Sequence, residues 1–176
     1  MVRDTFEAMR LPEGPVDPSP EFAASLKRRI EHIERQGASM SALDTEQRVI
    51  PYLMVSDARA AIEFYTEVFG AETVGDPVMM DDGRIGHAEL KVGGSTVYLA
   101  DEFPEMGFVG PLTLGGTTAS FHIRVADADA TYAHAVEAGA TPERPVVNQH
   151  GSRMGSLVDP WGHRWSTVSP EQPDRD

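Results

Sequence analysis

The sequence predicts an α+β protein made of two βαβββ modules, each a curled, antiparallel-rich sheet with one helix, plus an N-terminal helical extension. The main observation is an internal repeat. The segment VSDARAAIEFYTEVFGAE, from Val55, resembles VADADATYAHAVEAGATP, from Val125. In both copies an alternating strand precedes the segment and three strand-like runs follow it, which indicates a duplicated supersecondary unit.

Each module is expected to fold by the same local rules. Asp57 and Asp127 follow the first strand of their copies and are expected to cap the helices, because a carboxylate accepts hydrogen bonds from free helix N–H groups. Gly70 and Gly139 are natural helix stops. The strand-like runs that follow cover residues 72–80, 85–92 and 95–101 in the first copy and 145–149, 153–158 and 163–168 in the second.

The motif DPWG, from Asp159 to Gly162, lies between the last two runs. Aspartate at the first position, proline at the second and glycine at the fourth are what a type I turn prefers. Asp159 and Trp161 are therefore interpreted as turn residues rather than catalytic residues.

The chain is expected to divide into three parts. Residues 1–46 form an extension with one helix near residues 20–36, in which Ser19 is the cap and Pro20 the first helical residue. Residues 47–170 form the folded domain, and residues 171–176 form a tail. Within the domain we expect module one at 48–103, a linker at 104–117 and module two at 118–169. The glycine-rich linker is either a plain connection or a loop that moves over a cavity.

Composition excludes several classes of function. The chain has no cysteine, which excludes disulfides, thiolate metal sites and a cysteine nucleophile. Its formal net charge of −13 makes nucleic acid and anionic membranes poor partners. The first residues contain no long apolar run, so neither a signal peptide nor a membrane span is expected. We therefore expect a cytoplasmic protein.

Strand alternation predicts which side chains face away from the helices. Leu53, Val55 and Ile123 are assigned to the helix side. The opposite faces combine aromatic, sulfur-containing and polar side chains: Tyr52, Met54, His87, Glu89, Tyr98, Ser120, His122, Arg124 and Ser166. Such a mixture is typical of ligand pockets, so we expect these residues to line a small-molecule pocket. The alternative is a solvated sheet face.

These features together resemble the vicinal oxygen chelate superfamily, which includes glyoxalase I, extradiol dioxygenases, fosfomycin resistance enzymes and bleomycin resistance proteins. The resemblance rests on the paired modules, the V-x-D junctions, FYTEVFG and DPWGHRW. The segment GHAELKVGGSTVYLADEFPE is similar to the branch often labelled PhnB-like. The resemblance implies the glyoxalase/bleomycin resistance fold and a homodimer, but it leaves the activity open, because one fold hosts many functions.

Enzymes of this superfamily bind a divalent metal through side chains on equivalent strand positions. Counting from the shared junctions, the resemblance carries these positions to Ile50, Tyr98, Ser120 and Ser166. None offers the imidazole or carboxylate that this chemistry needs, so no metal and no other cofactor is predicted. A non-standard divalent metal site made of His87, Glu89 and His122 stays an open alternative.

Two functions fit these observations. The first is a metal-free protein that binds or sequesters an aromatic or cationic small molecule, as bleomycin resistance proteins do. The second is an enzyme of the superfamily, a lyase, isomerase, epimerase or dioxygenase, that acts on a small carbonyl compound. There His122 would be a base and Arg124 its electrophilic partner, since imidazole titrates near neutrality and guanidinium stabilises an enolate oxygen.

Overall fold

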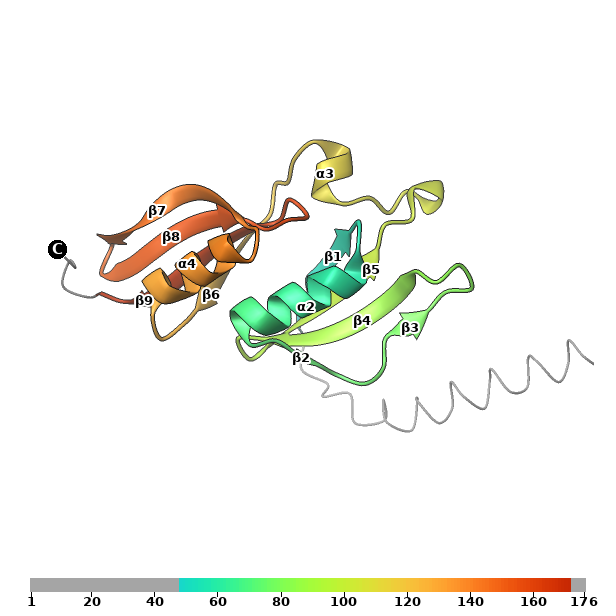
Figure 1. Cartoon of the computed structure of the whole chain (residues 1–176), viewed down its shortest axis with the longest axis horizontal. Coiled ribbons are helices and arrows are strands. Elements are labelled where there is room, and N and C mark those ends of the chain that lie inside the picture. Colours follow the sequence, from blue (N-terminus) through green and yellow to red (C-terminus); the bar gives the residue numbers. More distant parts are fainter. Residues whose placement is uncertain (1–47, 172–176) are drawn as a thin grey trace, which may run out of the picture. The chain divides into compact units, whose positions relative to one another are not determined.

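A computed structural model describes residues 48–171 of the chain (Figure 1). The expected helix near residues 20–36 lies outside the described residues, as does nearly all of the expected tail. Among the described residues, no helix has the length and apolar character that crossing a membrane requires.

The described residues form two mixed sheets with few helices, which confirms the predicted α+β class. In chain order the elements are β1 (Tyr52–Val55), α2 (Ala58–Phe69), β2 (Glu72–Thr73), β3 (Val78–Met79), β4 (Ile85–Val92), β5 (Ser95–Asp101), η2 (Pro104–Met106), α3 (Pro111–Leu114), β6 (Ser120–Arg124), α4 (Ala128–Glu137), β7 (Thr141–Gln149), β8 (Ser152–Val158) and β9 (Arg164–Pro170). We call the part from β1 to β5 module one and the part from β6 to β9 module two.

The two sheets repeat one topology. In module one the strand order is β1-β5-β4-β2, and β3 also pairs with β4. In module two the order is β6-β9-β8-β7. The first and last strands of each module pair in parallel, whereas the other pairs are antiparallel. The first strand therefore lies at an edge of each sheet, and its partner is the strand that ends the module.

Both helices begin at the predicted caps. The Asp57 carboxylate accepts a hydrogen bond from the Ala60 amide, and the Asp127 carboxylate accepts from the amides of Asp129 and Ala130. Helix α2 ends at Gly70, which adopts the left-handed conformation at φ 63°. Helix α4 ends at Ala138, one residue before the expected Gly139.

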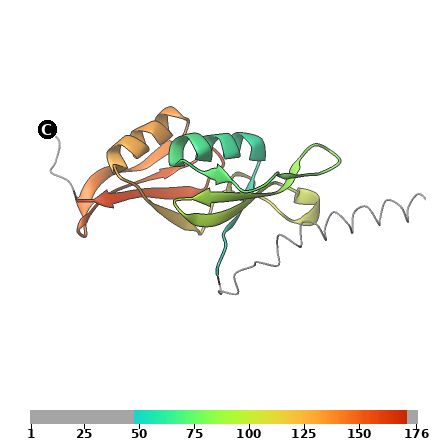
Figure 2. The ribbon, with the colours of Figure 1, turned by 90° about the horizontal axis from the view of Figure 1, so that it is seen from below.

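Each helix covers one face of its own sheet (Figure 2). Helix α2 buries Phe64, Tyr65 and Val68 there, and burial of such side chains stabilises the fold by roughly 1.5–3 kcal/mol each. The buried apolar side chains of both modules form one continuous cluster that includes Leu53, Ile123, Leu157 and Trp165. The predicted helix-facing residues are thus confirmed, and the two modules share a core.

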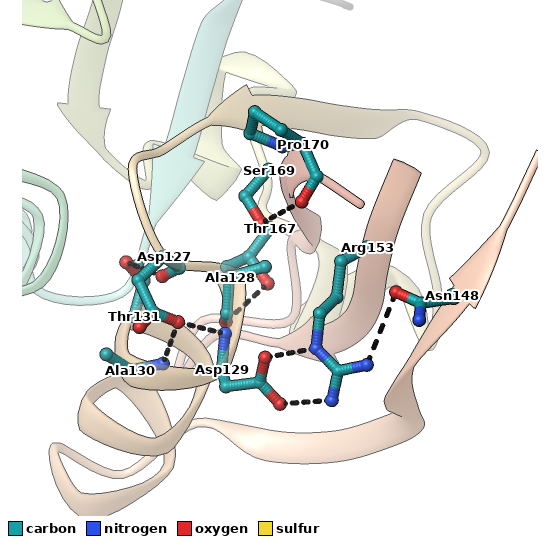
Figure 3. Close-up of polar contacts among 10 residues, drawn as sticks. All are labelled: Asp127, Ala128, Asp129, Ala130, Thr131, Asn148, Arg153, Thr167, Ser169 and Pro170. Carbon is teal, nitrogen blue, oxygen red and sulfur yellow. Dashed lines mark hydrogen bonds and ion pairs between the residues drawn. The ribbon is translucent and has the colours of Figure 1, made fainter. Parts of the chain in front are cut away.

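The first turn of α4 is tied to the face of β8 that the helix covers (Figure 3). The guanidinium of Arg153 forms a bidentate ion pair with the Asp129 carboxylate, and it also donates a 3.4 Å hydrogen bond to Asn148 Oδ1. The Arg153 side chain is only 9% exposed. This pair fixes the side of β8 that faces the helix, so Met154 and Ser156, the alternate residues, face the other way.

The segment between the modules is more structured than expected. It contains the 3₁₀ turn η2 and the four-residue helix α3, which starts with Pro111 directly after Gly110. Proline at the first helical position is favoured because its missing N–H is not needed there. The Glu102 carboxylate accepts hydrogen bonds from the Gly110 amide and the Thr113 hydroxyl, and these bonds fix the position of α3.

Candidate functional site

Module one has an apolar pocket on the sheet face that is turned away from α2. Its volume is about 130 Å³. It is lined by three methionines, three aromatic side chains and two small residues: Met54, Met80, Met106, Tyr52, Phe103, Phe108, Gly86 and Ala100. An engineered cavity of about 150 Å³ accepts benzene, so this pocket has room for one aromatic ring or a short aliphatic group.

An aromatic group borders this pocket on the same sheet face. The rings of Tyr52, His87 and Tyr98 contact each other edge to face, with centroids 4.7–5.8 Å apart. The Tyr52 hydroxyl donates to the Gly86 carbonyl at 3.0 Å and lies 3.1 Å from His87 Nδ1. Partial burial raises the pKa of Tyr52. Glu89 pairs with Tyr98 across the strands, so these four predicted residues lie together.

A short loop contributes Phe103, Met106 and Phe108 to the wall of the apolar pocket. Phe103 and Phe108 hydrogen-bond to each other through their backbones and close this loop, which we call the lid (residues 103–108). Arg84 ties the lid to the β3–β4 hairpin: its guanidinium binds Asp82 and Glu105 and donates to the Glu102 carbonyl. It also lies 3.9 Å above the Phe103 ring. The two carboxylates raise the pKa of Arg84, which therefore keeps its charge.

Module two has a polar cavity on the corresponding sheet face. Its volume is about 420 Å³, in the range of small-molecule sites. The predicted residues Ser120, His122 and Ser166 line it together with side chains from β7, β8 and the hairpin between them. Ser166 is buried, and its hydroxyl lies 3.0 Å from the Ser156 hydroxyl.

His122 and Arg124 also line a second groove, of about 430 Å³. This groove runs between β6 and the β4–β5 hairpin of module one, with Gly93 and Val97 on its other side. Both side chains are exposed and lie two residues apart on one face of β6. The structure thus brings the two residues of the enzymatic hypothesis into one groove.

The predicted pocket residues fall into two groups. Tyr52 and Met54 line the apolar pocket of module one, whereas Ser120, His122 and Ser166 line the polar cavity of module two. Within residues 48–171 no group of three or more histidine, aspartate or glutamate side chains is placed to hold a metal ion. His87, Glu89 and His122 are therefore not brought together.

The positions that the superfamily uses for metal do not fit a metal here. In module two these positions are Ser120 and Ser166, and the Ser166 hydroxyl is engaged with Ser156. In module one they are Ile50, which is apolar, and Tyr98, whose side chain is a phenol. Neutral hydroxyls are poor substitutes for the imidazoles and carboxylates of a divalent metal site.

The DPWG motif forms the expected turn, in which the Gly162 amide donates to the Asp159 carbonyl. The carboxylate of Asp159 is buried and accepts four hydrogen bonds, from the amides of Trp161 and His163, the Tyr65 hydroxyl and the Trp165 indole. A carboxylate with all of its lone pairs directed at donors is a structural group, which agrees with its interpretation as a turn residue.

Several residues that line these pockets were not predicted from the sequence. Met80 and Phe108 lie outside the helices and named strands, and Met106 ends the 3₁₀ turn η2, so strand alternation gives none of them a face. Arg144 and His150 line the polar cavity of module two. The His-Gly pair between two alternating runs was the available signal for His150, because it marks a tight hairpin turn.

Comparison with known proteins agrees with this architecture. The sequence profile of the Glyoxalase/Bleomycin resistance protein/Dioxygenase superfamily matches residues 28–167. An uncharacterized protein of Mycobacterium tuberculosis, MT0910, is 38% identical over 146 residues, which are 81% of this chain and 85% of that protein. A Mycobacterium bovis protein, Mb0911c, is 40% identical over 133 residues, 73% of this chain and 87% of that protein.

A solved structure shares the fold. It is a putative 3-demethylubiquinone-9 3-methyltransferase, PhnB protein, from Bacillus cereus, with a TM-score of 0.57 and 20% identity. The match covers 70% of this chain and 99% of that one. The profile match spans most of the chain, and the topology of paired modules agrees with it. The chain therefore belongs to the Glyoxalase/Bleomycin resistance protein/Dioxygenase superfamily, the vicinal oxygen chelate superfamily.

Proposed function

We propose that this chain is a metal-free small-molecule-binding member of the superfamily, which holds an aromatic group, neutral or cationic, in the apolar pocket of module one. The observation that carries the proposal is the lining of that pocket, which combines three methionines with three aromatic rings. Methionine adapts its shape to a ligand and makes favourable contacts with aromatic rings. Tyr52, Tyr98 and the nearby Glu89 would favour a positive charge on the ligand.

The proposal is tested with a neutral apolar probe, N-phenyl-1-naphthylamine. Its phenyl ring is of the size that the pocket admits, and its fluorescence rises in an apolar site. Met106→Glu places a charge on the pocket wall, and we expect it to weaken probe binding at least about fivefold. Leu114→Glu is the matched control, since Leu114 is also an exposed apolar residue (68% against 57% for Met106) and does not line the pocket. Equal binding to both variants would contradict the proposal.

We also propose that the chain belongs to the PhnB-like branch and acts as a homodimer. The branch is supported by the GHAELKVGGSTVYLADEFPE segment. The dimer is supported by exposed apolar side chains in the pocket lining and beside it, namely Met79, Met80, Met106 and Phe108, which a second copy would cover. Sedimentation velocity tests the dimer, because the sedimenting species should have twice the chain mass of 19.2 kDa. A monomer at micromolar protein concentration would contradict the proposal.

The second candidate function is proton transfer on a small carbonyl compound by His122 and Arg124. It is favoured by their shared groove, where the imidazole would remove a proton next to the carbonyl and the guanidinium would hold the enolate oxygen. The test follows exchange of dihydroxyacetone protons in D₂O by NMR. Catalysed exchange that is lost in His122→Gln supports this function, and exchange no faster than in buffer rejects it.

A further inference from the structure

The polar cavity of module two differs in charge from the rest of the molecule. The whole chain has a formal net charge of −13. The cavity is nevertheless lined by two arginines and two histidines against a single carboxylate: Arg144, Arg164, His122, His150 and Glu143. The two guanidiniums outnumber the carboxylate, and a local excess of positive charge on an acidic protein attracts anions to that place.

Four of the lining side chains form one row across the whole sheet. His122 on β6 pairs with Ser166 on β9, Ser166 pairs with Ser156 on β8, and Ser156 pairs with Arg144 on β7. With strands spaced about 4.8 Å apart, the row is roughly 14 Å long. It therefore presents an imidazole and a guanidinium at its ends and two hydroxyls between them.

The two arginines differ in whether a carboxylate compensates their charge. Arg164 is held by Glu143 through contacts of 2.8 and 2.9 Å, so its charge is largely compensated. The guanidinium of Arg144 makes no hydrogen bond or ion pair within residues 48–171. A guanidinium presents five N–H donors in a planar fork that matches the oxygens of a carboxylate or phosphate. Arg144 is the group available for such an anion.

The hairpin at the rim of the cavity has an unusual residue. β7 and β8 are joined by a two-residue turn in which both residues have positive φ, 51° at His150 and 75° at Gly151. Such turns prefer asparagine or glycine at the first position, because left-handed backbone is unfavourable for bulkier residues. His150 is the only described non-glycine residue with positive φ, and its side chain lines the cavity. Unfavourable backbone of this kind concentrates at functional sites.

We propose that this cavity binds a small oxyanion, a carboxylate or a phosphate, with Arg144 as its main anchor. One hydroxyl of the hydrogen-bonded Ser156–Ser166 pair and the two imidazoles are further donors. The inference goes beyond the proposed function, because it concerns the other module and a ligand group of opposite charge. Recognition is by guanidinium and hydroxyl donors, and no metal takes part.

The test is calorimetric titration of the full chain with acetate and with inorganic phosphate, beside acetamide and acetamidine as neutral and cationic analogues of acetate. None of these compounds carries the aromatic ring that the pocket of module one is proposed to hold. We expect one or both oxyanions to bind and the two analogues not to bind. Binding of acetate alone identifies a carboxylate site, and binding of phosphate alone identifies a phosphate site. Arg144→Gln should weaken oxyanion binding about tenfold.

Arg59→Gln is the matched control, because Arg59 is an exposed arginine on α2 that does not line the cavity. It should leave affinity unchanged. His150→Asn provides a second variant that keeps a residue suited to the turn and removes the imidazole, with an expected loss of about threefold. Equal affinity for acetate and acetamide would overturn the proposal, as would equal oxyanion affinity in Arg144→Gln and Arg59→Gln. Met106→Glu should not alter oxyanion binding, which separates this site from the apolar pocket.

Discussion

The hydroxyl of Tyr65 donates a 2.6 Å hydrogen bond to the carboxylate of Asp159, a residue 94 positions further along the chain. Tyr65 lies on α2 of module one, and Asp159 begins the DPWG turn of module two. Both side chains are buried. The bond therefore joins the two halves of the duplicated fold through their shared core.

Asp159→Asn should lower the free energy of unfolding by about 3 kcal/mol. An asparagine keeps one acceptor oxygen, but its amide nitrogen would face the indole N–H of Trp165, which can only donate, and one buried donor would lose its partner. The measurement is urea unfolding followed by tryptophan fluorescence. Asp57→Asn is the control, since asparagine caps a helix as well as aspartate does. Equal losses in both variants would show that the four-donor arrangement is unimportant.

Tyr65→Phe should change how stability depends on pH. Burial, helped by the neighbouring Asp159 carboxylate, raises the pKa of Tyr65 well above its ordinary value of 10. Above about pH 10 the unfolded chain loses this proton before the folded chain does, so the parent protein loses stability as pH rises. The variant should be about 1–2 kcal/mol less stable at pH 8 and should lose less between pH 8 and 11. Parallel curves for the two proteins would refute this.

Asp129→Asn should destabilise the protein by about 2 kcal/mol, since it removes the negative charge of the carboxylate that binds the nearly buried guanidinium of Arg153. Thermal and urea unfolding measure the loss. Glu67→Gln is the comparison, because the Glu67–His134 pair is solvent-exposed and such pairs contribute about 0–1 kcal/mol. If both substitutions cost the same, the Arg153 ion pair does not anchor α4.

Arg84→Lys should make the lid over the apolar pocket easier to open. Lysine keeps the charge but cannot contact Asp82, Glu105 and the Phe103 ring with one planar group. We expect the dissociation rate of N-phenyl-1-naphthylamine to rise about threefold, measured by stopped-flow fluorescence. Arg59→Lys should leave the rate unchanged. An unaltered rate in Arg84→Lys would mean that the lid opens without releasing Arg84.

Most of the fold could be predicted from the sequence because its signals are local. Asp57 and Asp127 cap their helices as expected, and alternation assigned Leu53, Val55 and Ile123 to the core. The helix α3 was not expected, because four residues between glycines carry too little periodicity to distinguish a turn of helix from a loop.

The candidate site was less predictable. Alternation put Tyr52, His87 and Tyr98 on one face, and their rings do touch. It could not show that His122 lies apart from His87 and Glu89, because the distance between residues of different modules depends on how the modules pack. Arg144 was also inaccessible to this reasoning, since the register of β7 shifts on both sides of it and a shift breaks the alternation.

The buried carboxylate of Asp159 has a practical consequence. It accepts hydrogen bonds from both modules, and the apolar core is continuous across them. Cutting the chain in the exposed stretch between Gly115 and Gly116 would yield two fragments, each with part of that core uncovered. Neither fragment could satisfy Asp159 and Tyr65 alone, so the two should recover their structure only by reassociating. The two fragments could therefore serve as a split reporter. If each is fused to one of two interacting proteins, reassociation buries Trp165 again and changes its fluorescence.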